Sequence, residues 1–448
     1  MLKRILRGLA KTGKWTLIVI AVIGVLVYIP SRLGWYGIYA KRYVISLSGN
    51  PISPARAWYD PQELVAGSDF MPLEAWPEGA NPIDPAVYEE AASWAEQQRS
   101  DSLVVLYKGR LAHASYFNDQ APESEFSTHS LTKVLTSILV GHAIADGHMD
   151  SVDQPAADFL PEWDTDERRG ITVRDLLNMA GGLEETFAFY PGSARLARTM
   201  GTDIVTANLD VGIYAPPGTA FSHANPNSQV AGIVVERATA KRFADYLSEK
   251  LWSPLGLRDG WLLLDREDGM VHTDCCMWTA IEDWALIGQA LMQNGCYAGQ
   301  QVIPAGWVDE MTKPSAANEN YGMQLWLGTS HEPLRKYDPS IEFMGNLHSE
   351  PFVADDLFFL DGAGDQRLYM IPSRELVILR TGKDGPEWDD SLLPNLFTRA
   401  VDEIGGQPAE ALPTRADLNA ACLGSGQVVA DAQHRASAVG GGLARHAE

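Results

Sequence analysis

A serine and a lysine lie three residues apart in an apolar stretch with helical spacing. Ser130 and Lys133 form the only Ser-x-x-Lys pattern in the 448-residue sequence, and residues three apart share one face of a helix. A lysine in a dry environment loses proton affinity and can accept the proton of a serine hydroxyl. The pattern therefore predicts a nucleophilic serine on a buried helix. The apolar residues that give this helix a wide buried face are Leu131, Val134, Leu135, Ile138 and Leu139.

The predicted helix runs from Leu131 to Ala145 and ends at Asp146-Gly147. Ser127 or Thr128 is expected to cap its start. On an exposed helix the same tetrapeptide would simply face water, but the apolar flanks argue against a solvated face.

Composition indicates a globular chain with a sizeable core, since 46% of the residues are hydrophobic and 9% are aromatic. The formal net charge of -23 makes nucleic acid an unsuitable partner, because phosphate binding needs clustered lysine and arginine. His142 and His148 stand alone and no His-Glu-x-x-His pattern occurs. We therefore expect neither a metal nor a cofactor.

The first 40 residues differ from everything after them. Five basic residues among the first fourteen precede a run from Trp15 to Ile29 without any charge. We expect residues 1–40 to form an uncleaved membrane anchor, with a cleaved signal peptide as the alternative. Basic residues keep the N-terminal end in the cytoplasm. In a bacterium this places the catalytic domain on the periplasmic side of the inner membrane.

The four cysteines are too few for a disulfide scaffold, although an exported domain allows one bridge. Cys275 and Cys276 are adjacent, and one of them could pair with Cys296. Cys422 lies in a segment without periodicity. Buried free thiols are the alternative.

Regular elements follow a lead-in segment at residues 41–87 that is rich in proline, glycine and aromatics. A helix is predicted over Pro85–Gln98, followed by a strand hairpin and a mainly helical middle region. The last part alternates strands with turns and closes with a helix from Leu392 to Ile404. Residues 405–448 are expected to be a flexible tail. The predicted strands are Ser102–Tyr107, Leu111–Phe117, Tyr321–Leu327, Leu357–Leu360, Arg367–Ile371 and Glu375–Arg380.

Four segments, taken together and in order, resemble those of the serine β-lactamase-like hydrolases, in particular the branch of class C β-lactamases, esterases and 6-aminohexanoate-dimer hydrolases. The resemblance covers residues 88–404. The segments are His129-Ser130-Leu131-Thr132-Lys133, Ile171–Leu183 ending in Met-Ala-Gly-Gly-Leu, Pro216–Asn225, and Asp361-Gly362-Ala363-Gly364-Asp365-Gln366 before a strand pair that contains Pro372.

This resemblance implies an α+β fold: an antiparallel sheet flanked by terminal helices, with a mainly helical lobe inserted between about residues 150 and 300. It also implies the site. The backbone N–H groups of Ser130 and Ala363 form an oxyanion hole. Gly362, Asn225 and Tyr190 contact substrate; Asn225 could alternatively hold a turn before Pro226. Tyr321 and Trp326 could line the cleft, and core packing is the alternative role for Tyr190, Tyr321 and Trp326.

The sequence departs from the family pattern at two positions. His223 replaces the tyrosine of a Tyr-x-Asn motif; we expect it to relay a proton to the leaving group, and the alternative is that it only fills the pocket. Leu360 stands where lactam-binding relatives carry a cation that holds a substrate carboxylate. Its presence argues against β-lactamase and carboxypeptidase activity.

The expected function is acyl transfer from a small ester or linear amide. Ser130 attacks the carbonyl, Lys133 takes its proton, and His223 passes it to the leaving group. One alternative is a module that binds cell-wall peptide or a partner without turnover, because two site motifs are altered. The other is a D-amino-acid peptidase whose carboxylate pocket is built elsewhere. The oligomeric state is not determined by the sequence.

Overall fold

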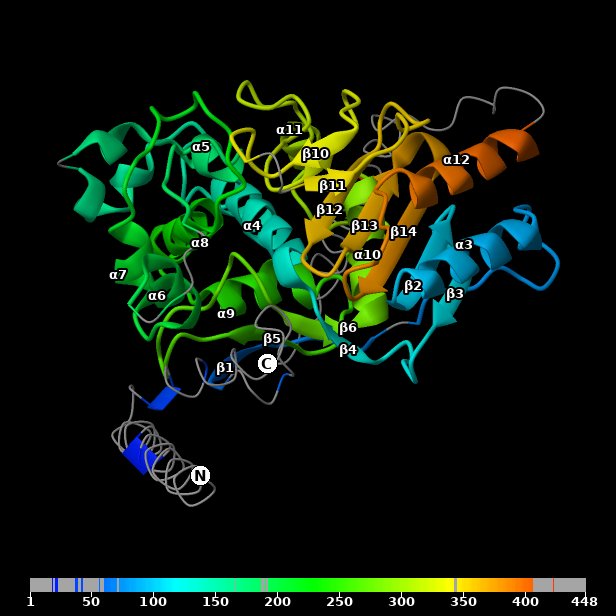
Figure 1. The fold of residues 1–448 in the computed structure, drawn as a ribbon, viewed down its shortest axis with the longest axis horizontal. Helices are drawn as coiled ribbons and strands as arrows, with labels where there is room; N and C mark the ends of the chain where they lie inside the picture. Colours follow the sequence, from blue (N-terminus) through cyan, green and yellow to red (C-terminus); the bar gives the residue numbers. More distant parts are fainter. Residues whose placement is uncertain are drawn as a thin grey trace, which may run out of the picture. The chain divides into compact units, whose positions relative to one another are not determined.

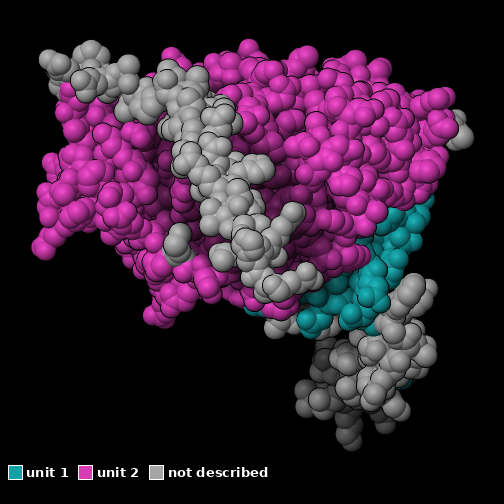
Figure 2. Space-filling view, turned by 180° about the vertical axis from the view of Figure 1, so that it is seen from behind, with its two compact units in different colours: residues 1–62, 186–210, 263–271 teal, residues 63–185, 211–262, 272–448 magenta. Residues whose placement is uncertain are grey.

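The computed structural model describes residues 60–405, except 71, 165, 187–189, 191 and 342–344, together with positions 18, 21, 22, 37, 38, 42, 56 and 422. The chain divides into two compact units (Figure 2). The first consists of Met1–Gln62, Thr186–Asp210 and Leu263–Val271, and the second of Glu63–Glu185, Val211–Leu262 and His272–Glu448. All residues predicted for the site except Tyr190 belong to the second unit.

The second unit is built around an antiparallel sheet of six strands in the order β3-β2-β14-β13-β12-β9. The predicted hairpin is confirmed as its edge pair, and most of the predicted C-terminal strands are present. The expected strand over residues 321–327 is wrong for most of its length, because the chain folds back there and Tyr321 bridges Trp326. The strands are β2 (Ser100–Tyr107), β3 (Arg110–Tyr116), β9 (Trp326–Leu327), β12 (Phe358–Gly362), β13 (Gln366–Ile371) and β14 (Leu376–Gly382).

Helices cover both faces of this sheet (Figure 1). Two terminal helices, α3 (Pro85–Gln97) and α12 (Leu392–Ile404), lie on one face. The first begins where Asp84 accepts a hydrogen bond from the Ala86 N–H (2.9 Å). The helix α10 (Ile281–Met292) packs against β2, β13 and β14 on the other face. The predicted arrangement of a sheet flanked by terminal helices is confirmed. The residues of α10 were expected in the inserted lobe, but the helix packs on the sheet.

Alternation along the strands explains why both faces are covered. Leu103, Val105 and Tyr107 of β2 belong to one hydrophobic cluster with residues of the two terminal helices. On the opposite face, α10 approaches so closely that a Cβ at Gly288 would lie 2.7 Å from Val377. A sheet buried on both sides is a rigid support for residues at its edge.

The middle of the chain is mainly helical, as predicted. In the second unit it comprises α4 (Lys133–Ala145), α5 (Val173–Leu177), α8 (Asn225–Thr239), α9 (Phe243–Leu247) and the π-helix η6 (Ser248–Trp252), with short 3-10 helices η3 (Ala156–Asp158), η4 (Pro161–Trp163) and η5 (Glu167–Gly170). The first unit contains α6 (Ala194–Met200) and α7 (Ile204–Leu209).

A second sheet of four strands, in the order β1-β5-β6-β4, leads into the predicted nucleophile. Its strand β4 ends directly before the 3-10 helix η2 (His129–Thr132). Its strand β1 lies within the predicted lead-in segment. The remaining elements are β1 (Gln62–Val65), β4 (Glu125–Ser127), β5 (Gly260–Leu263), β6 (Trp278–Ala280), β7 (Cys296–Tyr297), β8 (Gln300–Gln301), α11 (Trp307–Met311), β10 (Leu334–Lys336), β11 (Gly345–Leu347) and the 3-10 helix η7 (Pro372–Arg374).

Two disulfides correct the expectations for the cysteines. Cys275 pairs with its neighbour Cys276, and Cys296 pairs with Cys422. Neither the expected bridge from the adjacent cysteines to Cys296 nor the alternative of free thiols is correct. Sequence spacing could not reveal the Cys296–Cys422 pairing, because it spans 126 residues.

Two further expectations fall on residues that the structure largely leaves undescribed. They are the anchor at residues 1–40 and the tail at residues 405–448. Within the described residues, none of the helices has the length and apolar character needed to cross a membrane.

Candidate active site

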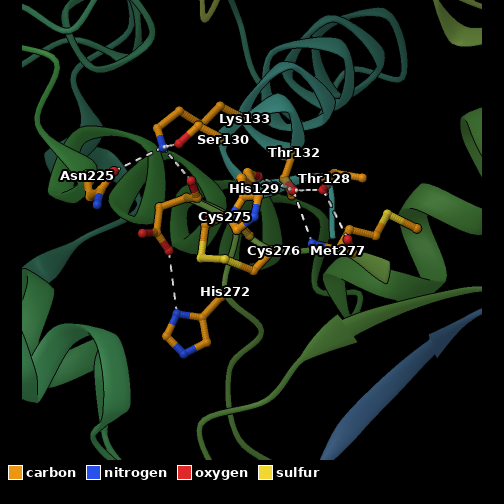
Figure 3. The surroundings of a disulfide bond; sticks show 12 residues. Thr128, His129, Ser130, Thr132, Lys133, Asn225, His272, Cys275, Cys276 and Met277 are labelled. Carbon is orange, nitrogen blue, oxygen red and sulfur yellow. Dashed lines mark hydrogen bonds and ion pairs between the residues drawn. A yellow bond between two sulfur atoms is a disulfide. The ribbon is translucent and has the colours of Figure 1, made fainter. Parts of the chain in front are cut away.

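The predicted nucleophile and base are in direct contact. The Lys133 amine donates a hydrogen bond to Ser130 Oγ over 2.9 Å (Figure 3). Ser130 lies in η2 and is partly exposed, whereas Lys133 opens α4 and is only 1% exposed. The three-residue spacing thus places a reachable hydroxyl beside a dry amine.

Lys133 is held by neutral oxygens. Its amine also donates to Asn225 Oδ1 (2.9 Å) and to the backbone carbonyl of Asp274. Burial lowers the pKa of Lys133 to about 8, and the more distant charges of Asp274, Glu185 and Asp361 oppose that shift. About one tenth of the amine is then neutral at pH 7. An amine in this state can accept the serine proton near neutral pH.

The turn that carries Ser130 is stabilised by threonines rather than by the cap predicted from sequence. Thr128 begins η2 without a capping hydrogen bond from its side chain. Its hydroxyl lies 2.6 Å from that of Thr132, which itself donates to the His129 carbonyl (2.8 Å). The expected N-cap role of Ser127 or Thr128 is therefore wrong, because Thr128 Oγ1 binds Thr132 and the Met277 carbonyl (3.1 Å).

His223 lies among aromatic rings beside the serine–lysine pair. Its ring stacks on Trp326 at 5.8 Å between centroids and lies 5.4 Å from Tyr337. Desolvation, and next the charge of Lys133, lower the pKa of His223 to about 3. The imidazole is therefore neutral at physiological pH. Among the described residues, no hydrogen bond joins it to Ser130 or Lys133, so the relay remains a prediction.

Two aromatic residues for which the sequence left core packing and cleft lining open pack around this histidine. Tyr321 lies edge-on to the His223 ring at 5.8 Å and to Trp326 at 4.9 Å. Tyr321 is 1% exposed and Trp326 is 2% exposed. Their structural role is to enclose His223.

The end of β12 lies against the residues just before the nucleophile. A Cβ at Gly362 would be 2.9 Å from the Thr128 carbonyl oxygen, so only glycine permits this approach. Ala363 follows at the exposed start of the β12–β13 turn. The structure thus gives Gly362 a packing role; its predicted substrate contact and the oxyanion role of Ala363 remain predictions.

Arg380 of β14 supports this turn from behind. Its guanidinium donates to the carbonyls of Gly364 (2.5 Å) and Asp365 (2.9 Å). The same side chain donates to Ser100 Oγ (2.8 Å) and to the Gln98 carbonyl (2.6 Å). Sequence reasoning missed this arginine, because its contacts join segments about 280 residues apart.

Asn225 opens α8 next to Pro226 and contacts the base. Its expected substrate contact remains a prediction. Its backbone N–H donates to the Glu185 carboxylate over 3.0 Å, and its side-chain oxygen accepts from Lys133. Tyr190 belongs to the first unit and is 59% exposed. Its substrate contact remains a prediction.

A buried charge cluster lies behind the strand segment that departs from the family pattern. Asp361 pairs with Arg335 (2.7 Å) and Arg367 (2.5 Å), and Asp390 pairs with the same two arginines (both at 2.7 Å). The Tyr337 hydroxyl donates to Asp361 (2.6 Å). Two arginines and two aspartates balance in charge. Sequence reasoning considered Leu360 here and missed its neighbour Asp361 as an ionic group.

Within the described ranges, no group of three or more histidine, cysteine, aspartate or glutamate side chains is arranged to hold a metal ion.

Comparison with known proteins agrees with this geometry. A family model described as Beta-lactamase matches residues 88–381, which is more than half of the chain. The chain belongs to the beta-lactamase family. It is therefore a member of a family of serine hydrolases, and the resemblance stated from the four sequence segments is confirmed.

Relatives within the beta-lactamase family carry several names. The 6-aminohexanoate-dimer hydrolase of Paenarthrobacter ureafaciens is 23% identical over 252 residues, which cover 52% of this chain and 64% of that protein. A D-aminopeptidase of Brucella canis is 27% identical over 180 residues, covering 37% of this chain and 32% of that protein. The matched segments thus span less than two thirds of these relatives.

A solved structure supports the fold. A Bacillus anthracis protein, provisionally assigned as a 6-aminohexanoate-dimer hydrolase, superposes with a TM-score of 0.61 over 80% of this chain and 93% of its own. Its sequence identity is 18%, so the likeness shows the beta-lactamase-like fold and not the substrate.

Proposed function

We propose that this protein hydrolyses small esters or linear amides through an acyl-enzyme, with Ser130 as nucleophile and Lys133 as general base. The observation that carries the proposal is the 2.9 Å contact between the Lys133 amine and Ser130 Oγ. It joins a buried amine of lowered pKa to a partly exposed hydroxyl. No other pair among the predicted site residues combines these properties.

The proposed reaction begins when neutral Lys133 takes the Ser130 proton and Oγ attacks the carbonyl. The oxyanion that forms is stabilised by the backbone N–H groups of Ser130 and Ala363. The proton then passes through His223 to the departing alcohol or amine, and water releases the acyl group. A neutral imidazole suits this relay, since one ring nitrogen accepts while the other donates.

The buried charge cluster supports a neutral substrate. In the part of the chain described, Arg335 and Arg367 each pair with Asp361 and Asp390. A cation whose charge is matched in this way offers little attraction to a substrate carboxylate. This agrees with the departure at Leu360 and favours esters and amides over penicillins and peptide C-termini.

Covalent labelling tests the proposal. A fluorophosphonate probe is expected to modify Ser130 of the full-length protein, and Ser130→Ala is expected to abolish the adduct seen by mass spectrometry. Surface Ser373→Ala serves as the matched control and should label like the parent. A folded parent protein that takes up no probe would instead support the alternative of a binding module.

A D-amino-acid peptidase is the second candidate, because relatives named D-aminopeptidase match part of the chain. Competition between substrates separates the two. Our proposal predicts a higher kcat/KM for neutral p-nitrophenyl esters and linear amides than for D-alanyl peptides. The reverse order would establish the peptidase.

We also propose that the charge-free run Trp15–Ile29 anchors the enzyme in the bacterial inner membrane, with the catalytic domain in the periplasm. The support is the basic residues before the run. Fractionation of cells that express the full chain should recover it from the inner membrane, with its catalytic domain open to protease added to the periplasm.

A further inference from the structure

A short segment beneath the serine–lysine pair connects it to two parts of the fold. We name residues His272–Met277 the base strap. On one side Thr273 accompanies α8: its N–H donates to Gln229 Oε1 (3.0 Å) and its hydroxyl to the Ser228 carbonyl (3.1 Å). On the other side the N–H of Thr128, the residue before η2, donates to the Met277 carbonyl over 2.9 Å.

Two backbone groups at the disulfide contact the catalytic residues, one at Lys133 and one in the turn that carries Ser130. The carbonyl of Asp274, directly before Cys275, accepts the Lys133 amine. The N–H of Cys276 donates to the carbonyl of His129, the residue before the nucleophile, over 3.0 Å. Figure 3 shows the disulfide with Lys133, Ser130 and His129 in its surroundings. In the sequence, the disulfide therefore joins the carbonyl that binds Lys133 to the N–H that binds the turn of Ser130.

A bond between adjacent cysteines closes a small ring around one peptide bond and so restricts the backbone on both sides of it. Cys276 also has a φ of 72°, a left-handed conformation that residues other than glycine seldom adopt. An open dithiol permits the extended conformations that this ring excludes. The Asp274 carbonyl would then no longer be fixed beneath the Lys133 amine.

We propose that the Cys275–Cys276 disulfide is a positioning element for Lys133, and that its reduction slows acyl transfer. This inference rests on the proposed hydrolase function. Reduction requires an added dithiol: its thiolate attacks the partly exposed Cys275, and Cys276, which is 8% exposed, leaves as a thiolate and takes up a proton. The second thiol of the reductant then releases Cys275 and becomes part of a cyclic disulfide.

The second disulfide must be removed before this effect can be measured alone. The full chain with Cys296→Ser and Cys422→Ser keeps only the bridge in the base strap. We treat this protein with dithiothreitol and measure p-nitrophenyl acetate hydrolysis and the rate of fluorophosphonate labelling. Because a displacement of about 1 Å in a catalytic group costs up to about a hundredfold in rate, kcat is expected to fall at least about tenfold. KM should stay within about twofold, since the base acts mainly after binding.

Two controls make the result specific. Removal of the reductant and reoxidation should restore kcat. The same chain with Cys275→Ser and Cys276→Ser in addition should be slow from the start and unaffected by dithiothreitol. Thermal unfolding is followed throughout. A loss of rate that merely follows a loss of folded protein would show a structural disulfide and overturn the inference.

The two proposals fail in different ways. If the oxidised protein takes up no fluorophosphonate, the hydrolase function itself fails. If it labels at Ser130 and keeps its full kcat after alkylation proves both thiols reduced, only the positioning role fails. Peptide mapping that finds free thiols at positions 275 and 276 in the untreated protein has the same consequence.

Discussion

Two of the buried cations in the described part of the chain, Lys133 and Arg335, have opposite surroundings. The Lys133 amine contacts neutral oxygens: the Ser130 hydroxyl, the Asn225 side-chain amide and the backbone carbonyl of Asp274. Burial lowers its pKa to about 8. Arg335 instead contacts the carboxylates of Asp361 and Asp390, whose charges raise its pKa against the effect of burial. Burial alone thus makes a base only where counter-charges are kept at a distance.

The pKa of His223 responds to both regions. After desolvation, Lys133 lowers its pKa most, Asp361 raises it and Arg335 lowers it. Desolvation therefore keeps the proposed relay neutral, and the charges of Lys133 and of the buried charge cluster adjust its pKa further. Four variants test the contrast between Lys133 and this cluster, beginning with the one of largest expected effect.

Replacing Lys133, the buried cation held by neutral oxygens, should have the largest effect on the rate. Lys133→Met keeps the length of the side chain and removes the base, so kcat/KM for p-nitrophenyl acetate should fall by about a hundredfold to ten-thousandfold. The exposed Lys313→Met is the matched control and should retain the parental rate. A Lys133→Met enzyme with parental kcat/KM would show that another group is the base.

Breaking the matched cluster should instead reduce stability. Asp390 accepts hydrogen bonds from Arg335 (2.8 Å) and Arg367 (2.7 Å), and Asp390→Asn leaves both arginines short of one negative charge. The free energy of unfolding in urea should fall by about 3–5 kcal/mol. Asp402→Asn, which removes an exposed pair with Arg374, should cost less than about 1 kcal/mol. Equal losses in both variants would refute the contrast.

His223→Phe keeps an aromatic ring against Trp326 and removes the relay. Amide turnover should fall by about tenfold to a hundredfold, because an amine cannot depart without a proton. Hydrolysis of p-nitrophenyl acetate should change much less, since p-nitrophenolate leaves unaided. Equal rates for parent and variant on both substrates would assign His223 to pocket filling.

The shift of the pH profile on replacing Glu185 should be the smallest of the four effects, and the charges determine its direction. The base must be neutral, so kcat/KM should rise with pH and level off above about 8, without an inflection near the usual histidine pKa of about 6.5. Glu185 raises the pKa of Lys133, so Glu185→Gln should move this limb to lower pH by less than about one unit. A shift to higher pH would contradict the electrostatic assignment.

Much of the fold follows from local pattern. The hairpin of β2 and β3, the helices α3 and α12, and the spacing of Ser130 and Lys133 depend on residues close in sequence, and the predictions for them are confirmed. The predicted strand over residues 321–327 was wrong, because the chain turns back on itself between Tyr321 and Trp326. Tyr321 and Trp326 pack around His223, and only Trp326 and Leu327 join the sheet, as β9.

The sequence by itself determined that a hydroxyl and an amine share one helical face, because that geometry repeats within a single turn. Only the tertiary structure decided which oxygens surround Lys133, which aspartates match Arg335, and that Cys296 pairs with Cys422. These outcomes depend on contacts between segments distant in the chain. Burial, which lowers the pKa of both Lys133 and His223, exists only once those segments have packed together.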